Sequence, residues 1–120
     1  MKSAPLMVWM VCITAASAFA SDAVDGYKKL AGSYAISSKN LIDPAPGEKQ
    51  DRAVFFLEGD SAMDIYNRMS GSAIKDTCAE ELLTKTSGGL TCSKEVGSSI
   101  YTCTFGVMLK SGALVEAKVC

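Results

Sequence analysis

Four cysteines in the last third of the chain constrain its fold more than any other feature of the sequence. Cys78, Cys92, Cys103 and Cys120 follow a segment typical of a secretion signal, and the chain contains no histidine. In an exported chain an even number of cysteines indicates disulfides. Structural zinc sites use close ligand pairs, and no such pair occurs here. We therefore expect two disulfides and no metal ion or other cofactor.

Residues 1–20 have the pattern of a cleaved signal peptide. Lys2 is their only charge, residues 6–20 are mostly apolar, and Ala18-Phe19-Ala20 matches a small-x-small cleavage site. The apolar run is shorter than the roughly 20 residues that cross a bilayer, so we expect no membrane span after cleavage. Cleavage removes Cys12 and leaves residues 21–120 as a single disulfide-stapled domain. The expected location is the bacterial periplasm or the cell exterior.

The charge of the chain argues against two classes of partner. It carries 12 Lys and Arg against 13 Asp and Glu, a formal net charge of −1, with no basic cluster. Nucleic acids and anionic membrane surfaces attract proteins through such clusters. We therefore expect no nucleic-acid partner.

The first half of the chain predicts a helix, two strands and a loop. Residues 22–32 indicate a short helix that Gly32 ends, and residues 33–42 have the β-branched and aromatic content of a strand. Residues 43–51 combine proline, glycine and charge, which predicts a solvated loop. Residues 52–58 are an apolar run of strand length, and we expect a central strand there.

The clearest helix signal covers residues 61–70. Ser61 and Asp64 have the spacing of a capping box, with Asp in place of the usual Glu. Gly71 is a natural C-terminal stop. Residues 72–86 are ambiguous, because 76–83 suit a helical turn whereas 81–86 suit the start of a strand. The helix has one apolar face, which we expect to pack in the core, formed by Ala62, Ile65, Tyr66 and Met69.

Two hairpins follow in the C-terminal third. Residues 101–109 alternate with period two, as in a half-buried strand. A two-residue loop at Gly97-Ser98 places Cys92 opposite Cys103, in a hydrogen-bonded pair. A three-residue loop at 110–112 pairs residues 103–109 with residues 113–119. Every facing pair on the side of the sheet that carries Cys103 is then apolar, including Cys103 with Val119. A two-residue loop would place charged side chains on the buried face instead.

These registers favour one of the three possible cysteine pairings. Cys92 and Cys103 are cross-strand neighbours, whereas Cys120 points to the other face. We therefore predict Cys92–Cys103 and Cys78–Cys120. The expected fold class is α+β, a small single domain with a helix packed on an antiparallel sheet and a C-terminal β-meander.

No constellation of residues indicates catalysis. A Ser-His-Asp triad is impossible without histidine. The S-x-x-K spacing at 72–75 and the K-T-S-G run at 85–88 resemble elements of penicillin-binding enzymes, but the chain is too short for that fold and lacks the S-D-N element. Glu58, Asp60 and Asp64 cluster where a helix N-terminus favours negative charge. We therefore predict no catalytic residue and no enzyme activity.

The main hypothesis is a non-enzymatic exported domain that binds another protein. Its general build is similar to that of periplasmic inhibitors of lysozyme-like hydrolases and of immunity proteins against cell-wall-attacking toxins, so the expected partner is a periplasmic hydrolase or toxin. Two alternatives remain: a structural or envelope-stress accessory protein that dimerises through an edge strand at 33–42 or 113–119, and a small carboxylate-dependent hydrolase. The predicted contact surface joins the 43–51 loop to the 59–64 junction through Glu48, Lys49, Asp51, Glu58, Asp60 and Asp64.

Overall fold

A computed structural model describes residues 3–5 and 24–120 of the chain. The predicted signal peptide (apart from residues 3–5), its cleavage site and Cys12 lie outside the described residues. No helix in the described part is both long and apolar enough to cross a membrane.

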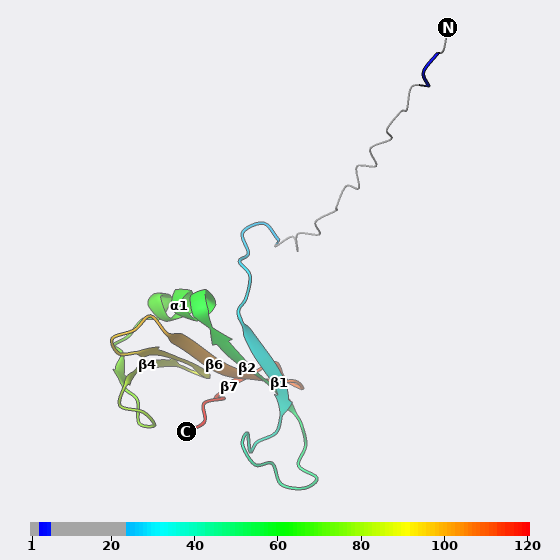
Figure 1. Cartoon of the computed structure of the whole chain (residues 1–120). Helices are drawn as coiled ribbons and strands as arrows, with labels where there is room; N and C mark the ends of the chain where they lie inside the picture. The colour runs from blue at the N-terminus through cyan, green and yellow to red at the C-terminus, as the bar shows by residue number, and fades with distance from the viewer. Residues whose placement is uncertain (1–2, 6–23) are drawn as a thin grey trace.

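The described chain forms one helix packed on an antiparallel sheet of seven strands, which confirms the α+β prediction (Figure 1). The strand order is β1-β2-β6-β5-β4-β3, and β7 pairs with β6. The helix α1 covers one face of this sheet. In chain order the elements are β1 (Gly32–Ser37), β2 (Arg52–Glu58), α1 (Gly59–Arg68), β3 (Ile74–Lys75), β4 (Leu82–Ser87), β5 (Leu90–Glu95), β6 (Tyr101–Met108) and β7 (Leu114–Val115).

The central strand β2 has the bounds that the sequence predicts, because its apolar run ends in loop residues on one side and in Gly59 on the other. It lies between β1 and β6. Ala53 and Leu57 on one of its faces are buried. On that side Leu57 packs in the main core with residues of α1, β5 and β6.

The apolar face of α1 confirms the predicted helix stripe. Ala62 is 0% exposed and Tyr66 6%, and Ile65 and Met69 pack against the same core. The ring of Tyr66 meets that of Tyr101 edge to face, with centroids 5.3 Å apart. Burial of these side chains on β5 and β6 is the main source of the helix's stability.

The predicted ends of this helix are wrong. It begins at Gly59, so Ser61 lies inside the first turn and cannot form a capping box with Asp64. The Ser61 hydroxyl donates instead to the carbonyl of Glu58, at 2.8 Å. Met69 is in an extended conformation and ends the helix before Gly71 is reached.

The helix predicted at 22–32 is absent from its described part, residues 24–32. Gly26 has φ +85° and forms a turn in which the Tyr27 N–H donates to the Val24 carbonyl. Gly32 begins β1 rather than ending a helix. A Cβ at Gly32 would lie 2.2 Å from the Phe56 carbonyl oxygen, so only glycine allows β1 to approach β2 here.

Residues 72–86, which the sequence leaves ambiguous, contain β3 and the start of β4. Ile74 and Lys75 pair with Thr84 and Leu83. No helix forms at 76–83, but a single turn joins β3 to β4, in which the Leu82 N–H donates to the Ala79 carbonyl at 3.1 Å.

The hairpin of β5 and β6 confirms the predicted register but not the predicted pair type. Cys92 faces Cys103. The Glu95 N–H donates to the Ile100 carbonyl at 3.0 Å, so residues 95 and 100 are a hydrogen-bonded pair. Pair types alternate along an antiparallel ladder, which makes Cys92 and Cys103 a non-hydrogen-bonded pair. Their α-carbons are 4.0 Å apart, in keeping with the closer spacing of such pairs.

The predicted register of β6 and β7 is wrong by one residue. Val107 faces Leu114, and the Met108 N–H donates to the Ala113 carbonyl, which leaves a four-residue loop at 109–112. The Leu109 N–H donates instead to the carbonyl of Asp51, next to β2. A Cβ at Gly106 would lie 2.9 Å from a methyl carbon of Val115, so this glycine permits the observed pairing.

The predicted disulfides are nevertheless both present, as Cys92–Cys103 and Cys78–Cys120. Pairing of β7 stops at Val115, and residues 116–120 leave the edge of the sheet. They lie against the face opposite α1, where Ala117 and Lys118 line cavities together with residues of β2 and β6. Cys78 holds the end of this segment.

Candidate functional site

The sheet face opposite α1 is rich in hydroxyl groups, and we call it the helix-free face. Side chains alternate between the two faces of a strand, so the residues between the core positions of β5 and β6 all point here. The register places Thr91 next to Thr104, and Ser93 next to Thr102. The core face of the same strands carries Cys92 and Cys103, so the two faces differ sharply in chemistry.

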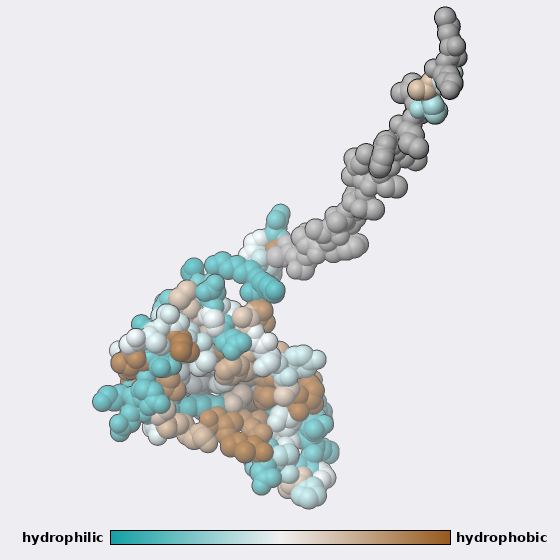
Figure 2. Space-filling model, in the orientation of Figure 1, coloured by the Kyte–Doolittle hydropathy of each residue, from teal (hydrophilic) through white to brown (hydrophobic). Residues whose placement is uncertain are grey.

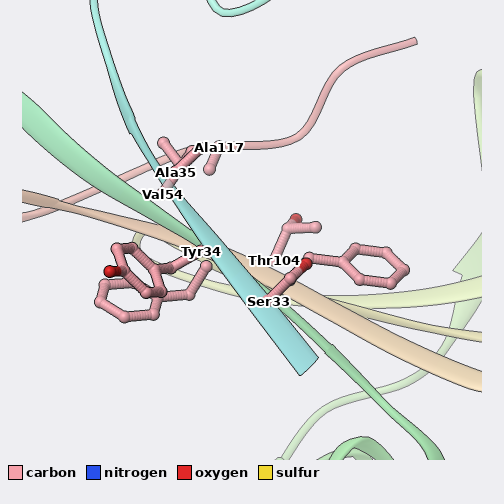
Figure 3. A pocket seen from close by; sticks show the side chains of 8 residues that line it. Ser33, Tyr34, Ala35, Val54, Thr104 and Ala117 are labelled. Carbon is pink, nitrogen blue, oxygen red and sulfur yellow. The ribbon is translucent and has the colours of Figure 1, made fainter. Parts of the chain in front are cut away.

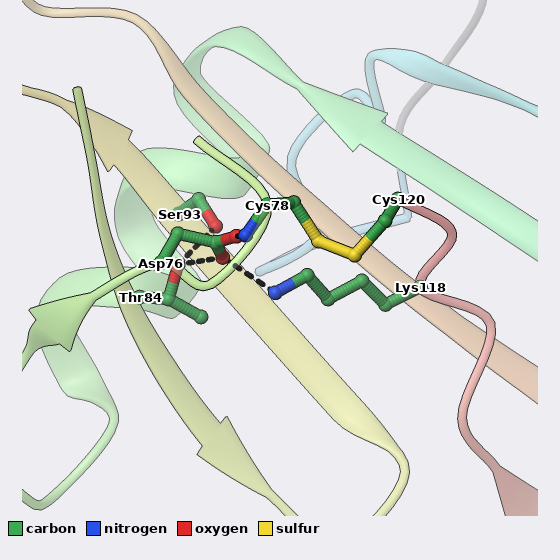
Figure 4. Close-up of polar contacts among 6 residues, drawn as sticks. All are labelled: Asp76, Cys78, Thr84, Ser93, Lys118 and Cys120. Carbon is green, nitrogen blue, oxygen red and sulfur yellow. Dashed lines mark hydrogen bonds and ion pairs between the residues drawn. A yellow bond between two sulfur atoms is a disulfide. The ribbon is translucent and has the colours of Figure 1, made fainter. Parts of the chain in front are cut away.

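A buried carboxylate, Asp76, organises one end of this face (Figure 4). Its side chain accepts hydrogen bonds from the Thr84 hydroxyl at 2.6 Å, the Cys78 N–H at 2.7 Å and the Lys118 ammonium group at 2.5 Å. The Thr84 hydroxyl also lies 2.8 Å from that of Ser93. Lys118 first, and then Thr84, lower the pKa of Asp76 to about 2. Asp76 is therefore ionised at neutral pH and fully paired.

Two links hold the C-terminal segment to the helix-free face. The Cys78–Cys120 disulfide joins residues 42 positions apart, and the Lys118–Asp76 ion pair lies beside it. Figure 4 shows both links side by side, one covalent and one electrostatic. Together they fix residues 118–120 over β5 and β6.

Three neighbouring cavities lie along this segment. The first, of about 220 Å³, lies over β1 and β2, where Ala117 approaches Ala35 and Val54 (Figure 3). The second, of about 190 Å³, shares Phe56 and Thr104 with the first. The third, of about 370 Å³, lies between the 39–43 loop and residues 118 and 119. In Figure 2 apolar surface (brown) gathers below the sheet, on the side away from α1.

Strand β1 forms one outer edge of the sheet, and no other strand of the described chain pairs with its free side. The Glu58 N–H donates to the Ala31 carbonyl, so residue 31 faces β2. Pair types alternate, and the N–H and C=O groups of Tyr34 and Ile36 therefore point outward. These groups are available to another strand.

The side chains of the same two residues are exposed and apolar. Tyr34 is 72% exposed and Ile36 47%. Tyr34 lies 6.3 Å from the ring of Phe55, which stacks on Phe105 at 4.9 Å. Phe105 in turn packs against the core, so an aromatic row runs from the core out to the β1 edge.

Strand β3, at the other end of the strand order, is better protected, although its Ile74 is 66% exposed. Strand β3 has two residues, and one of them is Lys75. Short edge strands and lysine are devices that prevent pairing with another chain. Strand β1 has six residues with no charge and no proline, so it lacks these protections.

The residues predicted to bind a partner fall into two groups that the structure does not bring together. Residues 48–51 precede β2 and residues 58–64 follow it, and a strand of seven residues separates them by roughly 20 Å. Their role in binding stays a prediction, but they do not form one continuous surface.

In the first group two carboxylates make local contacts. Glu48 accepts hydrogen bonds from the Asn40 and Ala45 N–H groups, and these, Ala45 first, lower its pKa. Asp51 pairs with Arg52 at 2.9 Å, which lowers the pKa of Asp51. Both side chains therefore shape the loop, while Lys49 is exposed.

The second group surrounds the start of α1. Asp64 pairs with Lys28 at 2.9 Å, and this contact lowers the pKa of Asp64. Asp60 lies in the first turn, where it is stabilised by the helix dipole. Glu58 is the N-cap residue and is exposed.

The lysine of the K-T-S-G run has a structural contact. The Lys85 ammonium group donates to the Tyr66 carbonyl at 3.0 Å and lies 4.4 Å from the centroid of the Tyr66 ring. It therefore binds a carbonyl at the C-terminal end of α1, which also accepts a bond from the Met69 N–H at 3.3 Å. Within residues 3–5 and 24–120, no group of three or more Cys, Asp or Glu residues could hold a metal ion.

Sequence reasoning missed the Asp76 cluster, whereas it named residues 33–42, which contain β1, as a candidate edge. The hydroxyl-rich face has a signal in the sequence, since Thr102 and Thr104 alternate with the apolar residues of β6. The pairing of Asp76 with Lys118, by contrast, joins residues 42 positions apart and has no local signal.

No protein-family model, curated protein or solved structure matches this chain.

Proposed function

We propose that this protein is a non-enzymatic exported domain that binds another protein by adding a strand of the partner to the free edge of β1. The single observation that carries the proposal is the unprotected edge of β1. Its outward N–H and C=O groups supply hydrogen bonds, and the exposed side chains of Tyr34 and Ile36 supply apolar contact. An extended segment with apolar residues at alternate positions matches this surface.

An inhibitor or immunity protein acting on a cell-wall hydrolase or toxin is the finer form of this proposal. The two disulfides support an oxidising compartment such as the periplasm or the cell exterior. Pairing of β1 with a strand of the hydrolase would hold this rigid, disulfide-bonded domain against the surface of the hydrolase. The carboxylates at 48–51 lie just beyond the end of β1 and would add contacts to a basic partner.

Two tyrosines provide a matched pair of variants to test the edge. Tyr34 and Tyr27 are 72% and 74% exposed, but Tyr27 precedes the strand. In affinity capture from the exported fraction of the source organism, followed by quantitative mass spectrometry, we expect Tyr34→Lys to lose a partner that Tyr27→Lys retains. Capture of the same proteins by both variants would refute binding at the β1 edge.

A proline variant separates backbone pairing from side-chain contact. The N–H of Ile36 points outward, so Ile36→Pro leaves the β1–β2 ladder intact and removes a donor from the free edge. We expect this variant to fold as the wild type does, by circular dichroism, and to lose the partner. A partner that is retained would show that no strand is added.

Self-association through the same edge is a second candidate, favoured by the sequence of β1 itself. An antiparallel pair centred on Ala35 places Tyr34 beside Ile36 of the second copy, and Ser33 beside Ser37. The outward backbone groups are those of Tyr34 and Ile36, so this register also satisfies the hydrogen bonds. Light scattering that gives a monomer mass at every concentration would exclude this candidate, whereas a dimer lost in Ile36→Pro would support it.

A further inference from the structure

Residues 116–120, which we call the strap, lie on the helix-free face without taking part in the sheet. The pairing of β7 with β6 stops at Val115. In the described chain, no backbone N–H or C=O group of these five residues bonds to another backbone group. Segments without such hydrogen bonds open more readily than the strands beside them.

The strap is held by side chains alone. Ala117 is buried in the first cavity, Lys118 pairs with Asp76, and Cys120 is bonded to Cys78. Ordering five residues costs conformational entropy, which one ion pair and one buried methyl group offset only in part. The disulfide is therefore the contact that keeps the strap on the face.

This disulfide is open to chemical attack from solution. Cys78 and Cys120 are both exposed, whereas Cys92 and Cys103 are buried in the core. A thiolate can reach the sulfur atoms of the first bridge without any opening of the sheet. Reduction of this bridge therefore leaves the second bridge intact.

The turn that carries Cys78 keeps its own contacts when the bridge opens. The Cys78 N–H donates to the Asp76 carboxylate at 2.7 Å, and the Thr84 hydroxyl donates to it at 2.6 Å. The Leu82 N–H donates to the Ala79 carbonyl in the same turn. None of these bonds involves the strap, so the change on reduction is confined to residues 116–120.

The strap separates two of the cavities from solvent. Ala117 lines the first cavity, and Lys118 and Val119 line the second. The two cavities share Phe56 and Thr104, from neighbouring strands of the sheet. When the three strap side chains move away, the two cavities become one open groove across β2 and β6.

We propose that the strap is a redox-controlled lid on the helix-free face, opened by reduction of Cys78–Cys120 and closed by its oxidation. The reductant is a dithiol. One of its thiolates attacks a sulfur atom of the bridge, which breaks the Cys78–Cys120 bond and forms a mixed disulfide, and its second thiol then displaces the remaining cysteine. Two electrons and two protons pass to Cys78 and Cys120, and the reductant becomes a disulfide. The lid is separate from the β1 edge and does not rest on the proposed function.

The test compares nuclear magnetic resonance spectra of isotope-labelled protein before and after reduction with dithiothreitol under native conditions. With Cys78–Cys120 reduced and Cys92–Cys103 intact, as peptide mapping verifies, we expect the amides of residues 116–120 to lose their native shifts and become mobile. The amides of β5 and of the core side of β2 and β6 should remain native. A neutral gadolinium chelate should then broaden the Val54 methyl and Phe56 ring resonances more than in the oxidised protein, and reoxidation should restore the first spectrum.

Two variants separate the disulfide from the ion pair. The double variant Cys78→Ser with Cys120→Ser should show the mobile strap without any reductant. Lys118→Gln keeps the disulfide, and its amide can still donate a hydrogen bond to Asp76. Its strap should therefore stay native when the protein is oxidised and become mobile on reduction.

Four results would overturn the proposal. The first is failure of dithiothreitol to reduce Cys78–Cys120 in the native protein, and the second is native shifts at residues 116–120 after this bridge is reduced. The third is loss of native shifts throughout the sheet on reduction of this bridge alone, which would make it a requirement of the fold and not the control of a lid. The fourth is a mobile strap in oxidised Lys118→Gln, which would give the controlling role to the ion pair.

Discussion

At the scale of the residue, Asp76 is the clearest case of a side chain whose chemistry depends on tertiary contacts. Its side chain is fully buried, and its charge is balanced by Lys118 from the C-terminal segment. A buried carboxylate of this kind is tolerated only because hydrogen bonds and an opposite charge replace its water. Asp76 therefore makes the fold sensitive to acid.

The stability of the protein should fall between about pH 4 and pH 2. The pKa of Asp76 is lowered in the folded state to about 2, so its contribution is present above the unfolded pKa and is lost as the pH falls through the folded value. A shift of this size corresponds to about 2 kcal/mol of unfolding free energy. Urea denaturation at a series of pH values measures it.

The control for this pH effect is Asp76→Asn. This variant keeps the shape of the side chain but leaves Lys118 without a counter-charge, and we expect it to be destabilised at pH 7 by about 3 kcal/mol. Its stability should then vary less than that of the wild type between pH 4 and pH 2. Equal acid dependence in the two proteins would contradict the assignment to Asp76.

At the scale of the element, the sequence predicts those segments whose local pattern and tertiary packing agree. The apolar run of β2 and the stripe of α1 are such cases, because Leu57, Ala62 and Tyr66 are buried where the pattern requires. The pair of Cys92 and Cys103 follows from one hairpin register in the same way. The local sequence of these elements is sufficient to predict them, without information about distant contacts.

Elements that depend on distant contacts were predicted poorly. Two contacts set the register of β7. Gly106 has no side chain and leaves room for Val115, and the Leu109 N–H donates to the Asp51 carbonyl. Apolar pairing alone favoured a register one residue away. Residues 24–31 do not form a helix, because they extend toward β1. Gly32 at the start of β1 lies close to the Phe56 carbonyl, which no local pattern indicates. The second cavity of the helix-free face likewise depends on where the C-terminal segment lies, which no local pattern indicates.

The two disulfides should differ in their reactivity toward thiols. Cys92 and Cys103 are 0% and 1% exposed, whereas Cys78 and Cys120 are exposed. Exchange requires a thiolate to reach a sulfur atom, so limited dithiothreitol under native conditions should reduce Cys78–Cys120 first. Alkylation and peptide mapping should then find labels on Cys78 and Cys120 only.

Loss of the Cys78–Cys120 bridge should lower stability by roughly 4 kcal/mol, the loop-entropy value for 42 residues. The double variant Cys78→Ser with Cys120→Ser should show this loss and should take up no label under the same conditions. Early labelling of Cys92 or Cys103 would mean that the core opens as readily as the C-terminal segment.

At the scale of the whole molecule, the strands at the two ends of the strand order, β1 and β3, differ in character, and the two faces of the sheet differ in chemistry. The core face packs on α1 and carries the aromatic row, and the helix-free face carries the hydroxyl groups. The short edge at β3 is protected by its length and by Lys75, and the edge at β1 is not. The β1 edge is therefore the end of the sheet at which addition of another strand is least hindered.

Hydrogen exchange resolved by residue tests this view of the sheet. The amides of Ser33, Ala35 and Ser37 point toward β2 and should exchange slowly, whereas those of Tyr34 and Ile36 point outward and should exchange fast in dilute protein. If the β1 edges of two copies pair, protection of Tyr34 and Ile36 will rise with protein concentration. If a separate partner is required, these two amides will stay unprotected at all concentrations until it is added. Protection of Tyr34 and Ile36 in dilute, partner-free protein would show that the β1 edge is already occupied, and the proposed binding by strand addition would then be wrong.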